Sequence, residues 1–315
     1  MDNQLLFNTE NRDKLFLASI LVGAALLFIL GPRSIQSSVI LKWGYAFGST
    51  AIVVVLGTAL YRLQMELQQS RLELARKEAE INFAKEVHQA LFPKHLPTIS
   101  GMEFSAVCIP ARGISGDYYD VMQLPDGRLI FAIADISGKG ISAAILVANL
   151  QAVLRVLAEN CDSPAQLCAR INHHLHHVTD SARFATFFYA EWDQRKRQLR
   201  YVNAGHHSPI LVGSKQGKKL QEGGLPLGIM PGYDFQVGEI DLETEDLLVL
   251  YSDGITEARS KQEEDFGEER LAKLVETNKE KSPREIQELI LEAIRQWSGE
   301  DQEDDMTLLI VKATR

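Results

Sequence analysis

Aspartates stand at the ends of several short apolar runs, and they are the residues in this sequence best suited to chemistry. Asp117 lies in GISGDYYD just before one run, Asp135 lies near the end of LIFAIADI, and Asp253 ends LLVLYSD. Asp304 and Asp305 precede the last run, MTLLIVK. A carboxylate beside a buried run lies where a strand enters or leaves the core, and a nearby glycine permits close approach of another chain segment.

Several converging carboxylates repel one another and raise each other's pKa values unless a divalent cation neutralises them. Hard oxygen ligands favour Mg²⁺ or Mn²⁺, and two such ions ~4 Å apart would orient water and a phosphate group for in-line attack. A single aspartate at a strand end is more commonly a turn or cap residue. Spacing along the chain leaves open whether these aspartates meet in space.

Other polar residues allow both a structural and a chemical interpretation. His206 and His207 lie in a loop, NAGHHSP, where they either stabilise a turn or act as proton donors. The HHLHH segment at 173–177 is interpreted as a polar helix face rather than a metal site. Lys139 in SGKG is expected to be a solvated lysine, with a phosphate contact as the alternative.

Short apolar runs separated by turn signals predict the strands that would carry these residues. The expected strands are 103–109, 118–124, 129–136, 184–192, 199–203, 210–212, 235–240, 247–251 and 306–312. The expected helices are 142–159, 164–178, 268–277 and 283–297. Many short strands with hairpin-length gaps and two pairs of helices predict an α+β fold with antiparallel sheets.

The first 61 residues predict a membrane anchor with two transmembrane helices, at about 15–31 and 43–61. A cleaved signal peptide is the alternative for the first stretch. The two spans predict a multi-pass protein of the cytoplasmic (inner) membrane. The second span is followed by Arg62, Arg71, Arg76 and Lys77, so the positive-inside rule predicts that residues 62–315 lie in the cytoplasm.

Residues 62–97 are predicted to form a helical linker that ends near Pro93 and Pro97. Leu60, Leu67, Leu74 and Ile81 recur every seven residues, which predicts a coiled-coil-like seam and a parallel homodimer. A solvated helix lying on its own domain is the alternative.

Composition excludes some function classes. Apolar residues make up 45% of the chain and charged residues 24%, which is ordinary for a folded protein. Residues 101–315 carry 23 Lys/Arg against 34 Asp/Glu, which argues against a nucleic-acid partner. Three cysteines without a CxxC pair predict neither a disulfide framework nor a zinc site.

A series of short motifs occurs in the C-terminal part of the chain. These motifs are GDYYD, ADISGKGISAA, FATFFYAEWD, YVNAGHHSPIL, GLPLGI, LVLYSDGITEA, FGEERL and DDMTLLIV. In these motifs and in their order, the chain resembles the SpoIIE/RsbU-type members of the PPM (PP2C-like) phosphatases over about residues 88–315. The resemblance implies an α-β-β-α sandwich of antiparallel sheets at 98–315 with two Mn²⁺ or Mg²⁺ ions.

By position, the resemblance implies that Asp135 bridges both metals and that the Ile136 carbonyl completes a site. Asp117 would hold one ion, while Asp253 and Asp304 would bind the other. Asp305 could substitute as a ligand or act from behind the ligands. The helix starting near Ser142 resembles the regulatory switch element of the family.

The implied activity is metal-dependent hydrolysis of phosphoserine or phosphothreonine on a cytoplasmic regulatory protein, most often a STAS anti-anti-sigma-like domain. The alternative is a membrane-tethered binding module that holds a regulator without catalysis. No sensor domain of the usual kind separates the membrane part from the phosphatase part, so the input signal stays open.

Overall fold

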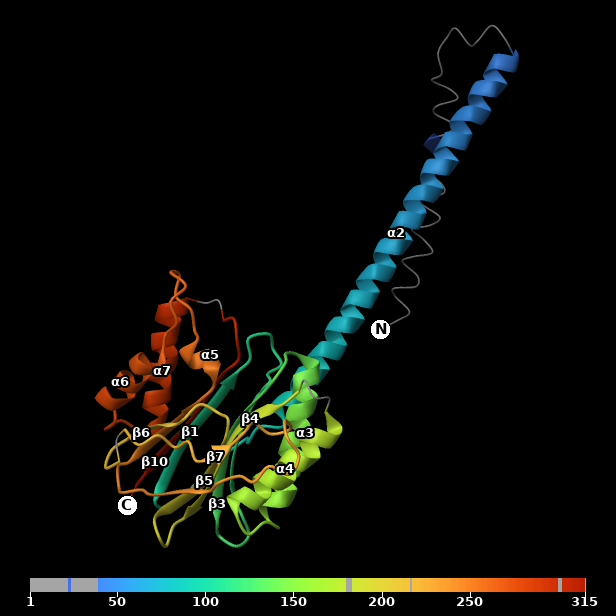
Figure 1. Ribbon diagram of the computed structural model, residues 1–315. Helices are drawn as coiled ribbons and strands as arrows, with labels where there is room; N and C mark the ends of the chain where they lie inside the picture. The colour runs from blue at the N-terminus through green and yellow to red at the C-terminus, as the bar shows by residue number, and fades with distance from the viewer. Residues whose placement is uncertain (1–21, 24–38, 180–182, 216, 300–301, 315) are drawn as a thin grey trace. The chain divides into compact units, whose positions relative to one another are not determined.

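The computed structural model describes residues 22–23, 39–179, 183–215, 217–299 and 302–314. The chain divides into two compact units, Met1–Ile81 and Asn82–Arg315. Figure 1 shows the strands gathered in the C-terminal unit, together with every helix that follows α2. The predicted first transmembrane segment, at 15–31, lies almost entirely outside the described residues.

A single helix, α2 (Val39–Gln89), covers the predicted second span and most of the predicted linker. It ends four residues before Pro93, a little earlier than the linker prediction. Length and composition alone would let two described helices cross a bilayer, one in Trp43–Gln89 and the other at Ile141–Ala158. The second belongs to the folded domain, because it packs on a sheet and six of its side chains are buried.

The four-stranded sheet is antiparallel throughout, as predicted, with the strand order β1-β10-β9-β6. Its strands are β1 (Met102–Ile109), β10 (Met306–Ala313), β9 (Leu247–Tyr251) and β6 (Ile210–Val212). The last strand of the chain therefore lies between the first strand of the domain and β9, which brings segments about 200 residues apart into direct hydrogen bonding.

The six-stranded sheet has the order β2-β3-β4-β5-β7, and β8 also pairs with β5. Its strands are β2 (Asp117–Gln123), β3 (Leu129–Ile136), β4 (Ala185–Asp193), β5 (Gln198–Ala204), β7 (Gly223–Gly224) and β8 (Gly238–Asp241). All its pairs are antiparallel except the two-residue contact of β5 with β7.

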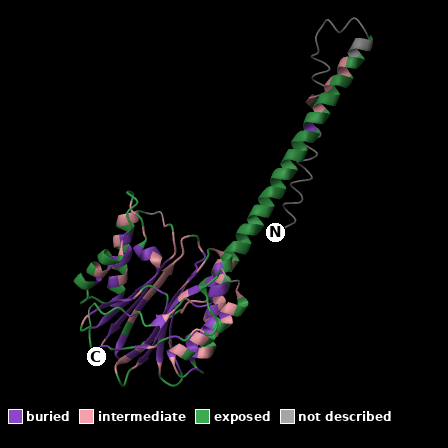
Figure 2. Cartoon of the chain, viewed as in Figure 1, coloured by how far each residue is buried: buried purple, intermediate pink, exposed green. Residues whose placement is uncertain are grey.

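Each sheet carries one helix layer on its outer face, which gives the expected α-β-β-α order (Figure 1). Helices α3 (Ile141–Ala158) and α4 (Pro164–Val178) cover the six-stranded sheet. Helices α6 (Glu268–Thr277) and α7 (Pro283–Ser298) cover the four-stranded sheet, and the short α5 (Asp253–Thr256) follows β9. Figure 2 shows buried residues concentrated on the strands between the two layers.

Strand β3 is apolar at nearly every position because it is covered on both faces. Its alternate residues Ile130, Ala132 and Ala134 pack under α3 and α4, whereas Phe131 and Ile133 face the other sheet. A strand covered on both faces reads as a continuous apolar run rather than an alternating one. Asp135, near the end of this run, is the exception, so its side chain does not serve the packing of the core.

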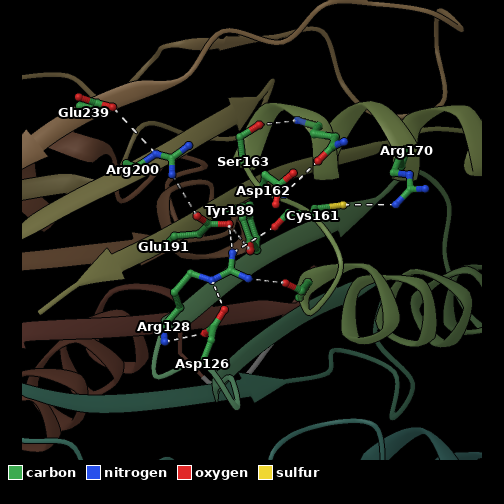
Figure 3. Close-up of polar contacts among 12 residues, drawn as sticks. Asp126, Arg128, Cys161, Asp162, Ser163, Arg170, Tyr189, Glu191, Arg200 and Glu239 are labelled. Carbon is green, nitrogen blue, oxygen red and sulfur yellow. Dashed lines mark hydrogen bonds and ion pairs between the residues drawn. The ribbon is translucent and has the colours of Figure 1, made fainter.

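The opposite end of β3 carries a separate ionic network (Figure 3). The buried Glu191 accepts a hydrogen bond from the Tyr189 hydroxyl at 3.0 Å and faces Arg128 and Arg200 at 3.4 and 3.8 Å. Arg128 also donates to the carbonyls of Ala158, the last residue of α3, and of Cys161 in the loop that follows. Arg128 thereby ties the end of α3 to the sheet, about 23 Å of extended strand from Asp135.

Candidate active site

Two of the predicted site residues lie directly opposite each other on adjacent strands. In the register of β2 with β3, the Cα atom of Asp117 pairs with that of Asp135. Like charges placed directly opposite across a sheet are destabilising, so this pairing costs stability if both side chains are ionised. Asp117 is buried, and its Oδ2 atom has no hydrogen-bond partner. An orphaned carboxylate oxygen facing a second carboxylate is the arrangement that a cation would stabilise.

The four-stranded sheet brings the other aspartates to the same end of the sandwich. Asp253 follows β9 and opens α5, while Asp304 and Asp305 precede β10. Gly254 makes this approach possible, because a Cβ atom at position 254 would collide with the Asp305 carbonyl oxygen. Ser252 fixes the register here: its N–H donates to the Thr307 carbonyl at 3.0 Å, and its Oγ accepts from the Thr307 N–H at 2.9 Å.

The electrostatics place all these carboxylates around Asp135. Burial first, and then the charges of Asp253, Asp304 and Asp305, together raise the pKa of Asp135 to about 7. Burial and then the Asp135 charge hold the pKa of Asp117 well above its usual range. Without a cation, the cluster therefore holds protons that ordinary aspartates would have lost at neutral pH.

Two of the carboxylates already have partners. The Lys139 Nζ atom lies 2.8 Å from Asp304 Oδ2, and both side chains are largely exposed. Asp305 accepts hydrogen bonds from the backbone N–H groups of Ala111 and Gly116, each at 2.8 Å. Throughout the part of the chain that the structure describes, no three His, Cys, Asp or Glu side chains are grouped as a ready metal site. The aspartates are thus neighbours in one electrostatic cluster, while the ligand assignments themselves stay predictions.

The backbone of Ile136, the predicted carbonyl ligand, lies beside the start of β2. The Ile136 N–H donates to the Gly116 carbonyl at 3.1 Å. A Cβ at position 116 would lie 3.1 Å from the Ile136 oxygen and 3.4 Å from the Ala143 Cβ. Glycine at 116 thus keeps this carbonyl accessible and lets β2, β3 and the first turn of α3 meet.

The two loop histidines behave differently from each other. His206 is buried, its Nδ1 atom lies 2.8 Å from the Thr186 hydroxyl, and burial lowers its pKa to about 3. A histidine that stays neutral at physiological pH cannot serve as an imidazolium proton donor. His207 is exposed and stacks on Tyr251, two residues before Asp253. The structural interpretation therefore holds for His206.

The HHLHH histidines also have structural partners. His174 Nε2 lies 2.8 Å from Asn149 Oδ1 on α3, and His176 Nδ1 lies 2.9 Å from the Gly228 carbonyl. His177 Nδ1 lies 2.8 Å from the His173 carbonyl.

Lys139, by contrast, has a role that the sequence interpretation missed. Its ion pair with Asp304 joins positions 165 residues apart, and no local pattern predicts such a contact.

Comparison with known families gives one match that covers most of the folded unit. The family described as Stage II sporulation protein E (SpoIIE) matches residues 125–314. The phosphoserine phosphatase RsbU of Bacillus subtilis is 32% identical over 238 residues, which cover 75% of this chain and 70% of RsbU. The phosphoserine phosphatase RsbP of the same organism is 28% identical over 148 residues, 45% of this chain and 36% of RsbP.

Solved structures agree with the fold. The PP2C phosphatase domain of SpoIIE from Bacillus subtilis, solved with a fragment of its regulatory domain, is 25% identical. It superposes with a TM-score of 0.59 over 67% of this chain and 63% of that one. The SiaA-PP2C domain of Pseudomonas aeruginosa superposes with a TM-score of 0.66 at 18% identity, over 76% of this chain and 98% of that one. Both have the PP2C architecture that the motifs predicted.

Proposed function

Because this chain belongs to the SpoIIE/RsbU-type PPM (PP2C-like) phosphatases, we propose that it is a metal-dependent protein serine/threonine phosphatase. The observation that carries the proposal is the convergence of carboxylates from both sheets on Asp135, with the orphaned oxygen of Asp117 opposite it. The donor set consists of hard oxygens, which fits Mg²⁺ or Mn²⁺.

In this proposal Asp117 and Asp135 would hold one ion and Asp135, Asp253 and Asp304 a second, with the Ile136 carbonyl completing one of the two sites. Two Mn²⁺ or Mg²⁺ ions would supply an activated water and offset the charge on the phosphoryl oxygens. Asp305, which is fixed by the N–H groups of Ala111 and Gly116, positions the loop before β2 rather than binding directly. Lys139 supplies a positive charge beside Asp304, where it can hold either that carboxylate or an incoming phosphate.

Phosphate release by the full-length protein tests this function. We expect hydrolysis of p-nitrophenyl phosphate and of a serine-phosphorylated STAS-domain protein in Mn²⁺ or Mg²⁺, and none in EDTA. Turnover that persists at full rate in EDTA would refute the metal-dependent mechanism.

The ion pair of Lys139 with Asp304 gives one reason to keep the alternative, a membrane-tethered binding module without catalysis. An ammonium group that permanently neutralises Asp304 would make a cation there unnecessary. Titration calorimetry separates the two functions, since a phosphatase must bind Mn²⁺ or Mg²⁺ and a pure binding module need not. No heat of Mn²⁺ binding, together with no phosphate release, would favour the binding module.

We place the protein in the inner membrane, with the phosphatase domain in the cytoplasm. Large apolar side chains cover the early part of α2 and are exposed; they include Trp43, Phe47, Ile52, Val55 and Leu56. A surface of this kind is costly in water and favourable in lipid. Fractionation with carbonate washing tests this placement, because a soluble protein would leave the membrane pellet.

We further propose that the later part of α2 forms a parallel homodimer. The heptad residues Leu60, Leu67, Leu74 and Ile81 are all exposed on this helix, which leaves the predicted seam free to pair. A Leu67→Cys variant should cross-link between two chains under mild oxidation. The wild-type chain is the control for its own thiols, of which Cys161 and Cys168 are buried and Cys108 is half-buried. Leu67→Cys protein that stays monomeric would leave α2 a simple tether.

A further inference from the structure

Exposed large apolar side chains are unevenly distributed over the folded unit. Among the described residues after 90 they are Ile141, Ile145, Val156, Val178, Phe184, Leu225, Ile229 and Met230. Within that described part, none of them lies on the four-stranded sheet or on α6 and α7. Six of them, Ile141, Ile145, Val178, Phe184, Ile229 and Met230, form what is called here the exposed apolar surface.

The helical part of this surface is continuous because α3 and α4 are antiparallel neighbours. His174 Nε2 lies 2.8 Å from Asn149 Oδ1 and joins the two helices. Ile145 lies one turn before Asn149 on α3, and Val178 lies one turn after His174 on α4. In an antiparallel pair both steps lead in the same direction, so Ile145 and Val178 lie toward the same end of the helix pair.

Two loops extend the surface. The Asn172 side chain on α4 donates to the Met230 carbonyl at 2.8 Å, which places the loop of Ile229 and Met230 beside α4. A Cβ at Gly228 in that loop would lie 3.7 Å from the Phe184 Cα. The Phe184 backbone in turn exchanges hydrogen bonds of 2.9 Å with Ser137.

The surface adjoins the aspartate cluster. Ser137 is two residues after Asp135, and Lys139, whose ammonium group pairs with Asp304, is two residues before Ile141. A protein that presents a phosphorylated side chain to the cluster is therefore within reach of the exposed apolar surface.

The charge of this helix layer favours an anionic partner. Helices α3 and α4 contain no aspartate or glutamate; their cations are Arg155, which pairs with the buried Asp120 at the far end of α3, and Arg170, and α4 also carries four histidines. The chain as a whole has a formal net charge of −9, and α6 and α7 together carry six glutamates. Two helices that contribute no carboxylate, in an otherwise acidic protein, repel a phosphorylated protein less than the glutamate-bearing helices α6 and α7 do.

From the position and the charge of this face, we propose that the exposed apolar surface is the docking site for the phosphorylated protein substrate. The proposal rests on the phosphatase function and adds where the substrate binds outside the aspartate cluster. Its occupant is a folded phosphoprotein with an apolar patch beside its phosphoserine. Apolar side chains at the centre of such an interface carry most of its affinity.

A pair of matched variants of the full-length protein tests the docking site. Ile145 and Val156 are β-branched residues on α3 with exposed fractions of 64% and 65%, but Val156 lies near the far end of the helix, outside the surface. For a serine-phosphorylated STAS-domain protein, Ile145→Ser should lower kcat/KM about tenfold, as expected for an interface anchor. Hydrolysis of p-nitrophenyl phosphate should not change in either variant, and Val156→Ser should match the wild type on both substrates.

The other outcomes overturn the proposal in recognisable ways. Equal kcat/KM values for Ile145→Ser and Val156→Ser would remove the docking site. Equal losses on both substrates would assign Ile145 to the fold or to catalysis instead. Self-association or vesicle binding that Ile145→Ser abolishes, with phosphoprotein turnover unchanged, would assign the surface to a second copy of the chain or to a membrane. A wild-type protein that hydrolyses neither substrate refutes the phosphatase function itself, and retention on the immobilised phosphoprotein then tests docking alone.

Discussion

The two helix layers of the folded unit differ in their outer faces: exposed large apolar side chains lie on α3 and α4, whereas none of the described ones lies on α6 or α7. Helix α7 begins with a capping box, in which the Ser282 N–H donates to Glu285 Oε2 at 2.9 Å and Ser282 Oγ accepts from the Glu285 N–H. Helix α3 begins after Gly140, at a φ of 74°, with no side-chain cap. The outer face of α7 is charged, whereas that of α3 carries Ile141 and Ile145.

The outer faces, rather than the helix starts, mark the layer of α6 and α7 as a scaffold. Capping is mixed in both layers, because α7 and α4 have a side-chain N-cap whereas α6 and α3 begin after a glycine without one. The first turn of α3 is held by tertiary contacts, next to the aspartate cluster and the exposed apolar surface. The proposed docking surface therefore lies on one helix layer, whereas the aspartates of the cluster come from both sheets.

The largest effect is expected from removing a proposed metal ligand. Asp253→Asn should lower phosphate release at least about 10³-fold, since bound ions supply several kcal/mol of charge stabilisation. The melting temperature should stay the same or rise, because one repelling carboxylate is gone. Steady-state kinetics and circular dichroism measure the two quantities.

Asp193→Asn is the matched control, at the end of a strand in the same fold. Asp193 ends β4 and accepts hydrogen bonds from the N–H groups of Arg195 and Lys196, so it is a turn residue. Its loss should reduce stability slightly and leave turnover intact. If Asp253→Asn behaved like Asp193→Asn, Asp253 would have to be removed from the proposed site.

The metal-free protein should lose stability as the pH rises through the titration of Asp135. Its pKa is raised to about 7 in the folded state, so between pH 4 and 7 the folded protein holds a proton that the unfolded chain has released. This favours folding at low pH, and the contribution, up to about 4 kcal/mol, disappears as the pH approaches 7. Urea unfolding in EDTA at pH 5 and pH 7.5 measures it.

Asp135→Asn and added Mn²⁺ give the controls for this pH dependence. The variant should flatten the profile, because the neutral amide has no proton to lose. Mn²⁺ should restore stability at pH 7.5 if the cluster binds it. If the wild-type protein in EDTA were as stable to urea at pH 7.5 as at pH 5, the electrostatic description of the cluster would be wrong.

Arg128→Met tests whether the far end of β3 is scaffold only. The variant leaves Glu191, which is 4% exposed, with Arg200 at 3.8 Å as its remaining cationic partner. Breaking a buried ion pair from one side should cost about 3 kcal/mol of unfolding free energy. Turnover per folded molecule should not change, because Asp135 lies at the other end of the strand. The exposed Arg195→Met variant should stay within about 0.5 kcal/mol of wild type.

Much of the fold could be predicted because local signals and tertiary structure agree. The predicted bounds of β3, β6, β9, α4 and α6 coincide with those observed, since each is an apolar segment between clear breakers. The strand β7 was missed, because two glycines carry no apolar signal and become a strand only by pairing with β5. The predicted strand at 235–240 is observed at Gly238–Asp241, because Phe235 packs into the core under α3 and α4 instead.

The candidate site divides in the same way. Its aspartates could be selected from the sequence, because several of them stand beside apolar runs with a glycine close by and fall in the motifs shared with the SpoIIE/RsbU-type phosphatases. The register that sets Asp117 against Asp135 and the ion pair of Lys139 with Asp304 depend on how distant segments pack. Such contacts leave no local pattern, so only the structure could reveal that one of the carboxylates already has a cation beside it.

The smallest expected effect tests the scaffold layer directly. Ser282→Ala removes the hydroxyl that accepts from the Glu285 N–H and should cost about 1 kcal/mol, the usual value for an N-cap. Since α7 packs on the four-stranded sheet away from α3, kcat and KM for both p-nitrophenyl phosphate and a phosphoprotein should match wild type. Urea unfolding and steady-state kinetics measure the two effects on the same preparation. If Ser282→Ala lowered phosphoprotein turnover as much as Ile145→Ser, the helix layers would be coupled, and assigning docking to α3 and α4 alone would be wrong.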